Sequence, residues 1–280
     1  MKSVTKAQIA VLAGSVIVIV LLLFANTTLP KKEGKPEMSD HAGAKSTGTT
    51  DINKLVDGAK IALNADQKQT FEKLEEALKT SSDKKGIFGN IIHLWDSLRQ
   101  PAIAAYYTEQ RSIAYPTEQS WNEAGNRYYA ATRFAKEPEK PVLYHKAMEC
   151  FEKTLELNPK NIEAKINLAA CYVEGSEDPM KGIGLLREVE KTDSNNVNLQ
   201  LNFAFFSEKS GQWDKAIARF NKVLKIQPDF IEAYVHLADA YEQKGDKAKA
   251  IENLRKYSSF IDDVTIKTEI EEYIKKLSQG

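Results

Sequence analysis

The C-terminal half of the chain repeats one pattern of apolar and polar positions every 34 or 35 residues. In each copy a large apolar residue is followed directly by alanine, and a second small residue and a second large residue come later in the copy. The aligned positions are Leu168-Ala169, Phe203-Ala204 and Leu237-Ala238, then Gly182, Ala216 and Ala250, then Leu186, Phe220 and Leu254. A period of this length predicts one pair of helices per copy. Small residues allow two helices to cross closely, and one pair cannot bury its own apolar face, so we expect the pairs to stack.

The same residues resemble the tetratricopeptide repeat (TPR) family. The resemblance is carried by Tyr234-x2-Leu237-Ala238-x2-Tyr241 together with Pro228, Gly245, Ala250 and Leu254. An earlier copy begins at Trp121-x2-Ala124-Gly125-x2-Tyr128 and continues, after an insertion expected at residues 135–141, at Ala147, Phe151 and Pro159. The resemblance covers residues 118–262, where it implies an all-α fold: an α-solenoid of TPR helix pairs.

Both flanks of this array are also predicted to be helical. Residues 264–280 carry one apolar stripe at helical spacing, which is typical of a C-terminal capping helix; the stripe is Ile266, Ile270, Tyr273, Ile274 and Leu277. Residues 52–115 carry weaker stripes around Phe71 and Trp95, and a third short helix is expected from Ile103 to Ile113. We interpret this region as a degenerate repeat pair or cap that packs on the first clear repeat.

The N-terminus contains an uncharged apolar segment, residues 9–25. At about 1.5 Å per residue it nearly spans a bilayer core, so residues 1–29 are predicted to be a single N-terminal transmembrane signal-anchor. A cleaved signal peptide and a buried core helix are the alternatives. Basic residues flank both sides, but the short tail with Lys2 and Lys6 favours a cytoplasmic N-terminus. We therefore expect the inner membrane, with the C-terminal part periplasmic, and a flexible linker at residues 30–51, which are rich in Gly, Ser, Thr and Lys.

Composition narrows the function classes. Lys+Arg and Asp+Glu are 39 each, so the formal net charge is zero, which argues against a protein that coats nucleic acid. The two cysteines, Cys150 and Cys171, exclude a disulfide-built scaffold. They fall in the second helix of one pair and the first helix of the next. At these positions they are either two buried free thiols or one disulfide.

Signatures of catalysis are missing from the sequence. The four histidines and two cysteines show no metal-ligand spacing, and no Gly-x-Ser-x-Gly turn occurs. We expect no cofactor, no metal site and no enzymatic activity. An enzyme would need unrecognised catalytic residues within 52–115.

The first helices of a stacked array line a groove. Matching groove positions hold Asn167, Asn202 and His236, and the earlier copy offers Asn122 and Asn126. An asparagine amide can donate and accept at once, and rows of Asn in some TPR proteins hold extended peptides this way. Phe205, with Val173 and Tyr129, is expected to supply apolar pockets. The alternative is that these Asn residues are simply solvated.

Some members of the family clamp a C-terminal carboxylate with cations in this groove. The matching positions here lack the cations, which argues against such a clamp; they are Glu163, Ile166, Asn198, Leu201, Glu232 and Val235. The sequence therefore favours a membrane-anchored scaffold that binds a polypeptide segment of an envelope partner in assembly, secretion or maturation. The alternative is a structural self-assembling module, which would be a homo-oligomer.

Overall fold

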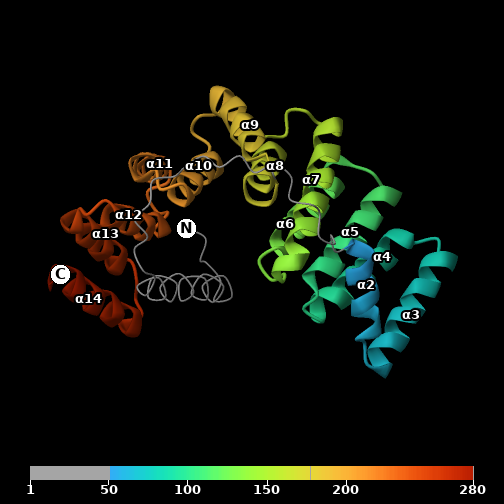
Figure 1. The fold of residues 1–280 in the computed structure, drawn as a ribbon. Helices are drawn as coiled ribbons and strands as arrows, with labels where there is room; N and C mark the ends of the chain where they lie inside the picture. The colour runs from blue at the N-terminus through green and yellow to red at the C-terminus, as the bar shows by residue number, and fades with distance from the viewer. Residues whose placement is uncertain (1–50, 177, 280) are drawn as a thin grey trace, which may run out of the picture. The chain divides into compact units, whose positions relative to one another are not determined.

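The computed structural model describes residues 51–176 and 178–279, and within these ranges the secondary structure is entirely helical (Figure 1). The predicted anchor at residues 1–29 and all of the predicted linker except Asp51 lie outside the described residues. No helix in the described ranges is both long enough and apolar enough to cross a membrane.

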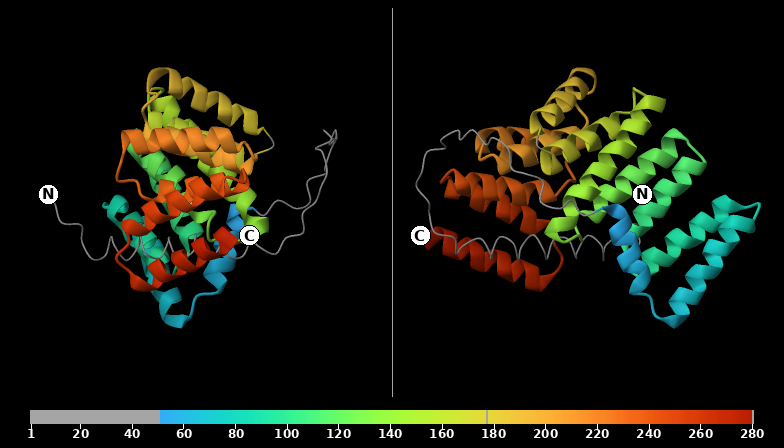
Figure 2. Two further views of the ribbon diagram at one scale, coloured as in Figure 1. Left: turned by 90° about the vertical axis from the view of Figure 1, so that its left-hand side faces the viewer. Right: turned by 45° about the vertical axis from the view of Figure 1, so that its right-hand side comes forward.

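Four helix pairs form the main array. The first helices of the pairs are α6 (Glu118–Ala131), α8 (Ile162–Gly175), α10 (Val197–Lys209) and α12 (Glu232–Gln243). The second helices are α7 (Lys140–Leu157), α9 (Pro179–Thr192), α11 (Trp213–Ile226) and α13 (Lys247–Ser259). Each helix packs on the next along the chain, as all three views show (Figures 1 and 2).

Local sequence sets where these helices begin. Asn161 and Asn196 precede α8 and α10, and each side-chain oxygen accepts a hydrogen bond from the third backbone N–H of its helix, at 2.8 and 3.1 Å. This is the favoured capping geometry for asparagine. The turns before α11 and α13 contain Gly211 and Gly245 with φ of 68° and 81°, a conformation that glycine adopts without a steric penalty.

The repeating positions are buried, which confirms the predicted register. Every aligned Leu, Phe and Ala is at most 9% exposed. At Gly182, an added Cβ would lie 2.4 Å from the Ala169 carbonyl oxygen, so α9 crosses α8 at a point where only glycine fits. At Gly125 an added Cβ would lie 2.7 Å from the Phe151 ring. Small residues thus occupy the helix crossings, as the pattern predicted.

The expected insertion at residues 135–141 is only partly right. Helix α6 ends at Ala131, and a short 3-10 turn, η2 (Glu137–Glu139), leads directly into α7. Lys140 and Pro141 are the first residues of α7, which at 18 residues is longer than the 14-residue α9 and α11. Proline is tolerated in the first turn of a helix, because the backbone N–H it lacks has no partner there. Part of the insertion therefore lengthens a helix.

From residue 51 onward, four further helices precede the array: α2 (Ile52–Ile61), α3 (Ala65–Thr80), α4 (Lys84–Ser97) and α5 (Pro101–Ala114). Phe71 packs edge-on against Trp95 and Tyr107, with ring centroids 5.4 and 6.0 Å apart. Helix α5 packs on α6. At the other end α14 (Val264–Gln279) packs on α13 (Figure 2), and Ile270, Ile274 and Leu277 of the predicted apolar stripe are buried.

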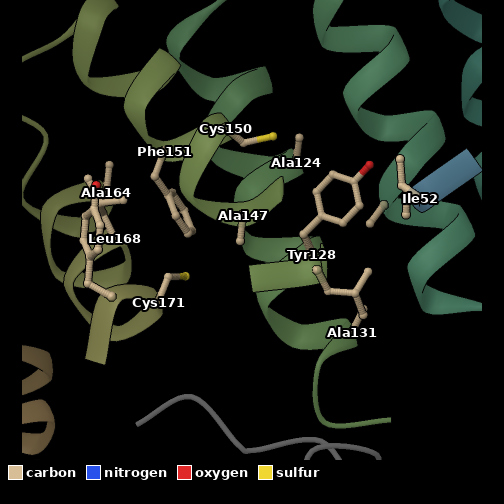
Figure 3. Packing of buried hydrophobic residues seen from close by; sticks show 13 residues of the cluster. Ile52, Ala124, Tyr128, Ala131, Ala147, Cys150, Phe151, Ala164, Leu168 and Cys171 are labelled. Atoms are coloured by element: carbon tan, nitrogen blue, oxygen red, sulfur yellow. The ribbon is translucent and has the colours of Figure 1, made fainter. Parts of the chain in front are cut away.

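Both cysteines are free thiols in the largest buried cluster of the array. Cys150 comes from α7 and Cys171 from α8, and Figure 3 shows them among the side chains of Phe151, Ala147 and Leu168. Burial raises the pKa of both thiols. The structure thus shows the free-thiol alternative.

Candidate interaction face

The first helices share one side of the array. Helix α8 touches both α6 and α10, in addition to its sequence neighbours α7 and α9. Partly exposed side chains of α6, α8, α10 and α12 therefore follow one another along a strip, which we call the first-helix face. The second helices lie on the other side of this layer.

An amide–amide–carboxylate chain joins two repeats on this face. Asn167 Nδ2 donates to Asn126 Oδ1 at 2.8 Å, and Asn126 Nδ2 donates to Glu163 Oε1 at 3.1 Å. Each amide nitrogen carries a second N–H and each oxygen can accept twice. The group therefore retains both donors and acceptors for a polypeptide backbone. The structure brings these two predicted asparagines together.

The other two predicted asparagines behave differently. Asn202 Nδ2 donates to the carbonyl oxygen of Asn198, one turn earlier in the same helix, at 2.9 Å. Asn122 Oδ1 is buried and accepts no hydrogen bond. Among the described residues neither amide hydrogen-bonds to the Asn126–Asn167 pair, so the four asparagines do not form one continuous row.

Aromatic rings form a second cluster where α10 and α12 meet. Phe205 is 39% exposed and lies edge-on to His236, with ring centroids 5.0 Å apart. His236 stacks on Phe220 of α11 at 4.9 Å with an interplanar angle of 8°. Phe205 also contacts Phe220 edge-on at 5.6 Å. The two predicted residues, Phe205 and His236, thus belong to one aromatic platform, of which Phe205 is the exposed part.

Carboxylates surround this platform, and the sequence patterns had not singled them out. Glu208 Oε1 lies 3.5 Å from His236 Nδ1, is buried and accepts no hydrogen bond. Burial raises the pKa of Asp239, and the nearby charges of Glu208 and Glu242 add to that rise. Helix α12 carries three carboxylates and no Lys or Arg. Glu208 and Asp239 come three residues, about one helical turn, after the predicted site residues Phe205 and His236. Extending the predicted face by one turn along each helix would therefore have included both carboxylates.

Tyr129 was predicted to supply an apolar pocket, but its hydroxyl group is hydrogen-bonded to a carboxylate. Its hydroxyl donates to Glu174 Oε1 at 3.2 Å, while the hydroxyl of Tyr144 donates to Oε2 at 3.0 Å. Burial and the Glu174 charge raise the pKa of Tyr144 to about 12. Val173 lies against Gly182 of α9 and lines a groove on the side of the second helices. It therefore does not belong to the first-helix face.

No group of three or more His, Cys, Asp or Glu side chains within residues 51–176 and 178–279 is arranged to hold a metal ion. What the face offers is hydrogen-bonding amides, an aromatic platform and negative charge. These groups suit the recognition of an extended polypeptide with basic side chains.

Two family models match the chain. One, described as TPR repeat, matches residues 209–245, and the other, described as tetratricopeptide repeat, matches residues 232–259. Both matches fall within the segment that runs from the end of α10 to the end of α13.

Two curated relatives match part of the chain. Superkiller protein 3 of Schizosaccharomyces pombe is 27% identical over 120 residues, which make up 40% of this chain and 9% of that protein. The BBSome complex member BBS4 homolog of Drosophila melanogaster is 23% identical over 134 residues, 48% of this chain and 28% of that protein. The chain thus spans less than a third of the length of these relatives.

A solved structure shows the same fold. The crystal structure of a tetratricopeptide repeat protein from Parabacteroides merdae superposes with a TM-score of 0.54 at 16% identity. The match covers 81% of this chain and 86% of that one. At this identity the likeness concerns the fold alone.

Proposed function

We propose that the chain is a tetratricopeptide repeat protein and a non-enzymatic scaffold whose first-helix face binds an extended polypeptide segment of a partner. The observation that carries this proposal is the Asn167–Asn126–Glu163 chain, which places unused donors and acceptors across the junction of two repeats. A hydrogen-bonded pair that spans repeats holds both amides in fixed positions. A ligand backbone then meets groups that are already ordered, which lowers the entropic cost of binding.

The partner segment is expected to be basic. Glu163, Glu208 and Asp239 lie on the first helices, and α12 carries no cation to balance its three carboxylates. Binding an arginine or lysine beside Asp239 would also remove the repulsion from its neighbouring carboxylates. The exposed edge of Phe205 supplies a surface on which a guanidinium can stack.

A selection experiment tests this function. Short random peptides displayed on phage are selected on the full chain, and the affinities of the recovered peptides are measured by fluorescence anisotropy. We expect the recovered sequences to be enriched in Lys and Arg, and Asn126→Ala/Asn167→Ala to weaken their binding about tenfold or more. The matched control is Asn53→Ala/Asn221→Ala, the same chemical change at two exposed positions outside the first helices.

The results of this experiment distinguish peptide binding from self-assembly. Equal loss in the two double variants, or recovered peptides without an excess of basic residues, would contradict the proposal. Association of the chain with itself that Asn126→Ala/Asn167→Ala abolishes would instead support the self-assembling module as the function of this face.

We also propose that the scaffold is tethered to the inner membrane through residues 9–25, with the repeats outside the cytoplasm and the partner in the envelope. The support is the uncharged apolar run and the short basic tail before it. Protease added to spheroplasts should digest the repeats while the same cells keep their cytoplasmic proteins intact. Protection of the repeats until the cells are lysed would reverse this topology.

A further inference from the structure

The side of the array formed by the second helices contains a groove between α9 and α11, with α10 at its base. Its cavity volume is about 830 Å³. Met180 and Ile183 of α9 and Phe206 of α10 provide apolar surface. We call it the outer groove. It shares no lining residue with the Asn167–Asn126–Glu163 chain or with the Phe205–His236 platform.

One ion pair fixes the walls of the outer groove. Arg219 of α11 pairs with Glu190 of α9, and its guanidinium lies over the Phe203 ring at 4.4 Å. Arg219 also donates to Oε1 of the fully buried Gln200 at 2.8 Å. The hydrogen bond and charge of Arg219 hold the pKa of Glu190 below its usual range. Since these contacts join α9, α10 and α11, the groove exists before any ligand arrives.

Unpaired positive charge lines this groove. Arg187 and Lys222 form no ion pair among the described residues, and Lys215 Nζ donates to the neutral side chain of Gln212 at 2.6 Å. Glu190 is the one carboxylate along the described lining, and Arg219 already neutralises it. Four cations, Arg187, Lys215, Arg219 and Lys222, thus face a single carboxylate along the described lining, which gives the groove a net positive charge.

Apolar surface lies beside these cations. Met180 is 64% exposed, although it is a large apolar side chain, and Ile183 and Phe206 are partly exposed within the groove. Methionine is unbranched and adapts to differently shaped apolar partners. Exposed apolar surface rimmed by charge is characteristic of protein–protein contact sites.

We propose that the outer groove binds an acidic segment of a protein partner that carries large apolar side chains. The carboxylates would pair with Arg187, Lys215 and Lys222, and the apolar side chains would cover Met180, Ile183 and Phe206. A flat bilayer cannot reach the base of a groove, and a nucleic-acid backbone leaves an apolar floor uncovered. This site goes beyond the proposed function of the first-helix face, because it selects a partner of the opposite charge and allows two partners to bind at once.

Three synthetic amphipathic peptides test the proposal by fluorescence anisotropy on the full chain carrying Asn126→Ala/Asn167→Ala, the double variant that weakens the basic-peptide site proposed on the first-helix face. The first has Leu and Phe on one face and Glu elsewhere, the second replaces every Glu with Lys, and the third keeps Glu but replaces Leu and Phe with Ser. We expect the first to bind and the other two to bind at least about tenfold more weakly. Equal binding of the first and third peptides would overturn the apolar part of the proposal, and preference for the Lys peptide would overturn the whole.

A matched pair of variants locates the site. Arg187→Glu/Lys222→Glu reverses two lining charges, whereas Lys191→Glu/Lys225→Glu makes the same change at exposed positions on the same two helices outside the lining. The first pair should weaken binding of the acidic peptide at least about tenfold, and the second at most about twofold. Met180→Gln, a change at a largely exposed side chain, should also weaken it. Equal effects of the two charge-reversal pairs would show general attraction and overturn the site.

Two other occupants are distinguished with the same variants. Sedimentation with vesicles of phosphatidylserine and phosphatidylcholine that is lost only in Arg187→Glu/Lys222→Glu would assign the groove to a membrane and overturn the proposal. Concentration-dependent self-association, measured by light scattering and lost only in that pair, would assign it to a second copy and overturn it equally.

Discussion

Helix α9 crosses the backbone of α8 closely at Gly182, where the substitution Gly182→Ala should lower stability. The new Cβ would be 2.4 Å from the Ala169 carbonyl oxygen, 2.9 Å from Val173 Cγ2 and 3.0 Å from Tyr172 Cβ, against an ordinary contact of 3.4 Å or more. The first of these atoms belongs to the backbone and cannot rotate away. Helix α9 must therefore move about 1 Å away from α8, a typical overpacking distortion.

A control on the same helix isolates this effect. Gly184 is exposed, and a Cβ added there would meet nothing within 4 Å. Both substitutions gain about 1 kcal/mol of helix propensity when glycine becomes alanine. Overpacking at Gly182 costs about 1–3 kcal/mol. Gly184→Ala should thus stabilise the chain by up to about 1 kcal/mol, and the two variants should differ by the clash alone, about 1–3 kcal/mol.

Urea unfolding followed by far-UV circular dichroism measures the difference. Because repeat arrays can unfold in parts, hydrogen exchange of the α8 and α9 amides provides a local second readout. Gly182→Ala should speed exchange in these two helices, whereas Gly184→Ala should not. Equal free energies of unfolding for the two variants would refute the close crossing, and with it the register on which the repeat assignment depends.

Three further predictions follow from buried and charged groups. Tyr128→Phe should lower the free energy of unfolding by about 1.5–3 kcal/mol, because the Tyr128 hydroxyl donates to the buried carboxylate of Glu109 at 2.6 Å; a loss below the error of urea titration would contradict this. Cys150 and Cys171, whose thiol pKa values are raised by burial, should react with a thiol reagent only after denaturation, and then as two thiols per chain without added reductant; rapid labelling of the folded chain would count against it. Since the pKa of Asp239 is raised in the folded state, its ionisation weakens folding as pH rises through the folded pKa. Asp239→Asn should therefore raise the melting temperature at neutral pH, and this increase should vanish below the pKa that Asp239 has in the unfolded chain. An unchanged or lower melting temperature at neutral pH would argue against this reasoning.

The repeat register could be predicted from the sequence because each crossing is specified by residues close together in the chain. Gly182 must be small to pass Ala169, and the same requirement recurs one repeat later at Ala216. A spacing that recurs at intervals of 34 or 35 residues records this local geometry directly. Burial of the aligned positions therefore follows from the pattern without any knowledge of the distant chain.

Hydrogen bonds on the first-helix face could not be predicted in the same way. A surface asparagine can bond a neighbouring side chain or the carbonyl oxygen four residues earlier, and its sequence position does not decide between them. Asn167 bonds Asn126, which is 41 residues away, whereas Asn202 bonds Asn198 of its own helix. The choice depends on side chains that only the stacked repeats bring together.

The sequence does not predict the outer groove, for a related reason. Its lining comes from four consecutive helices, α8 to α11, at positions that do not recur with the repeat period, so the repeat pattern does not mark it. Val173 is an example. It lies near the end of the first helix α8, and we expected it on the first-helix face, but its side chain lies against Gly182 on the side of the second helices.

The central claim is that the first-helix face contacts a partner polypeptide, and site-specific photocrosslinking in cells tests it most directly. A benzoylphenylalanine replaces Phe205, which is 39% exposed on that face, or Phe134, which is 78% exposed in the turn after α6. We expect a discrete adduct with another polypeptide from position 205, lost when Asn126→Ala/Asn167→Ala is added, and no such adduct from position 134. The same adducts from both positions, or none from position 205, would contradict it.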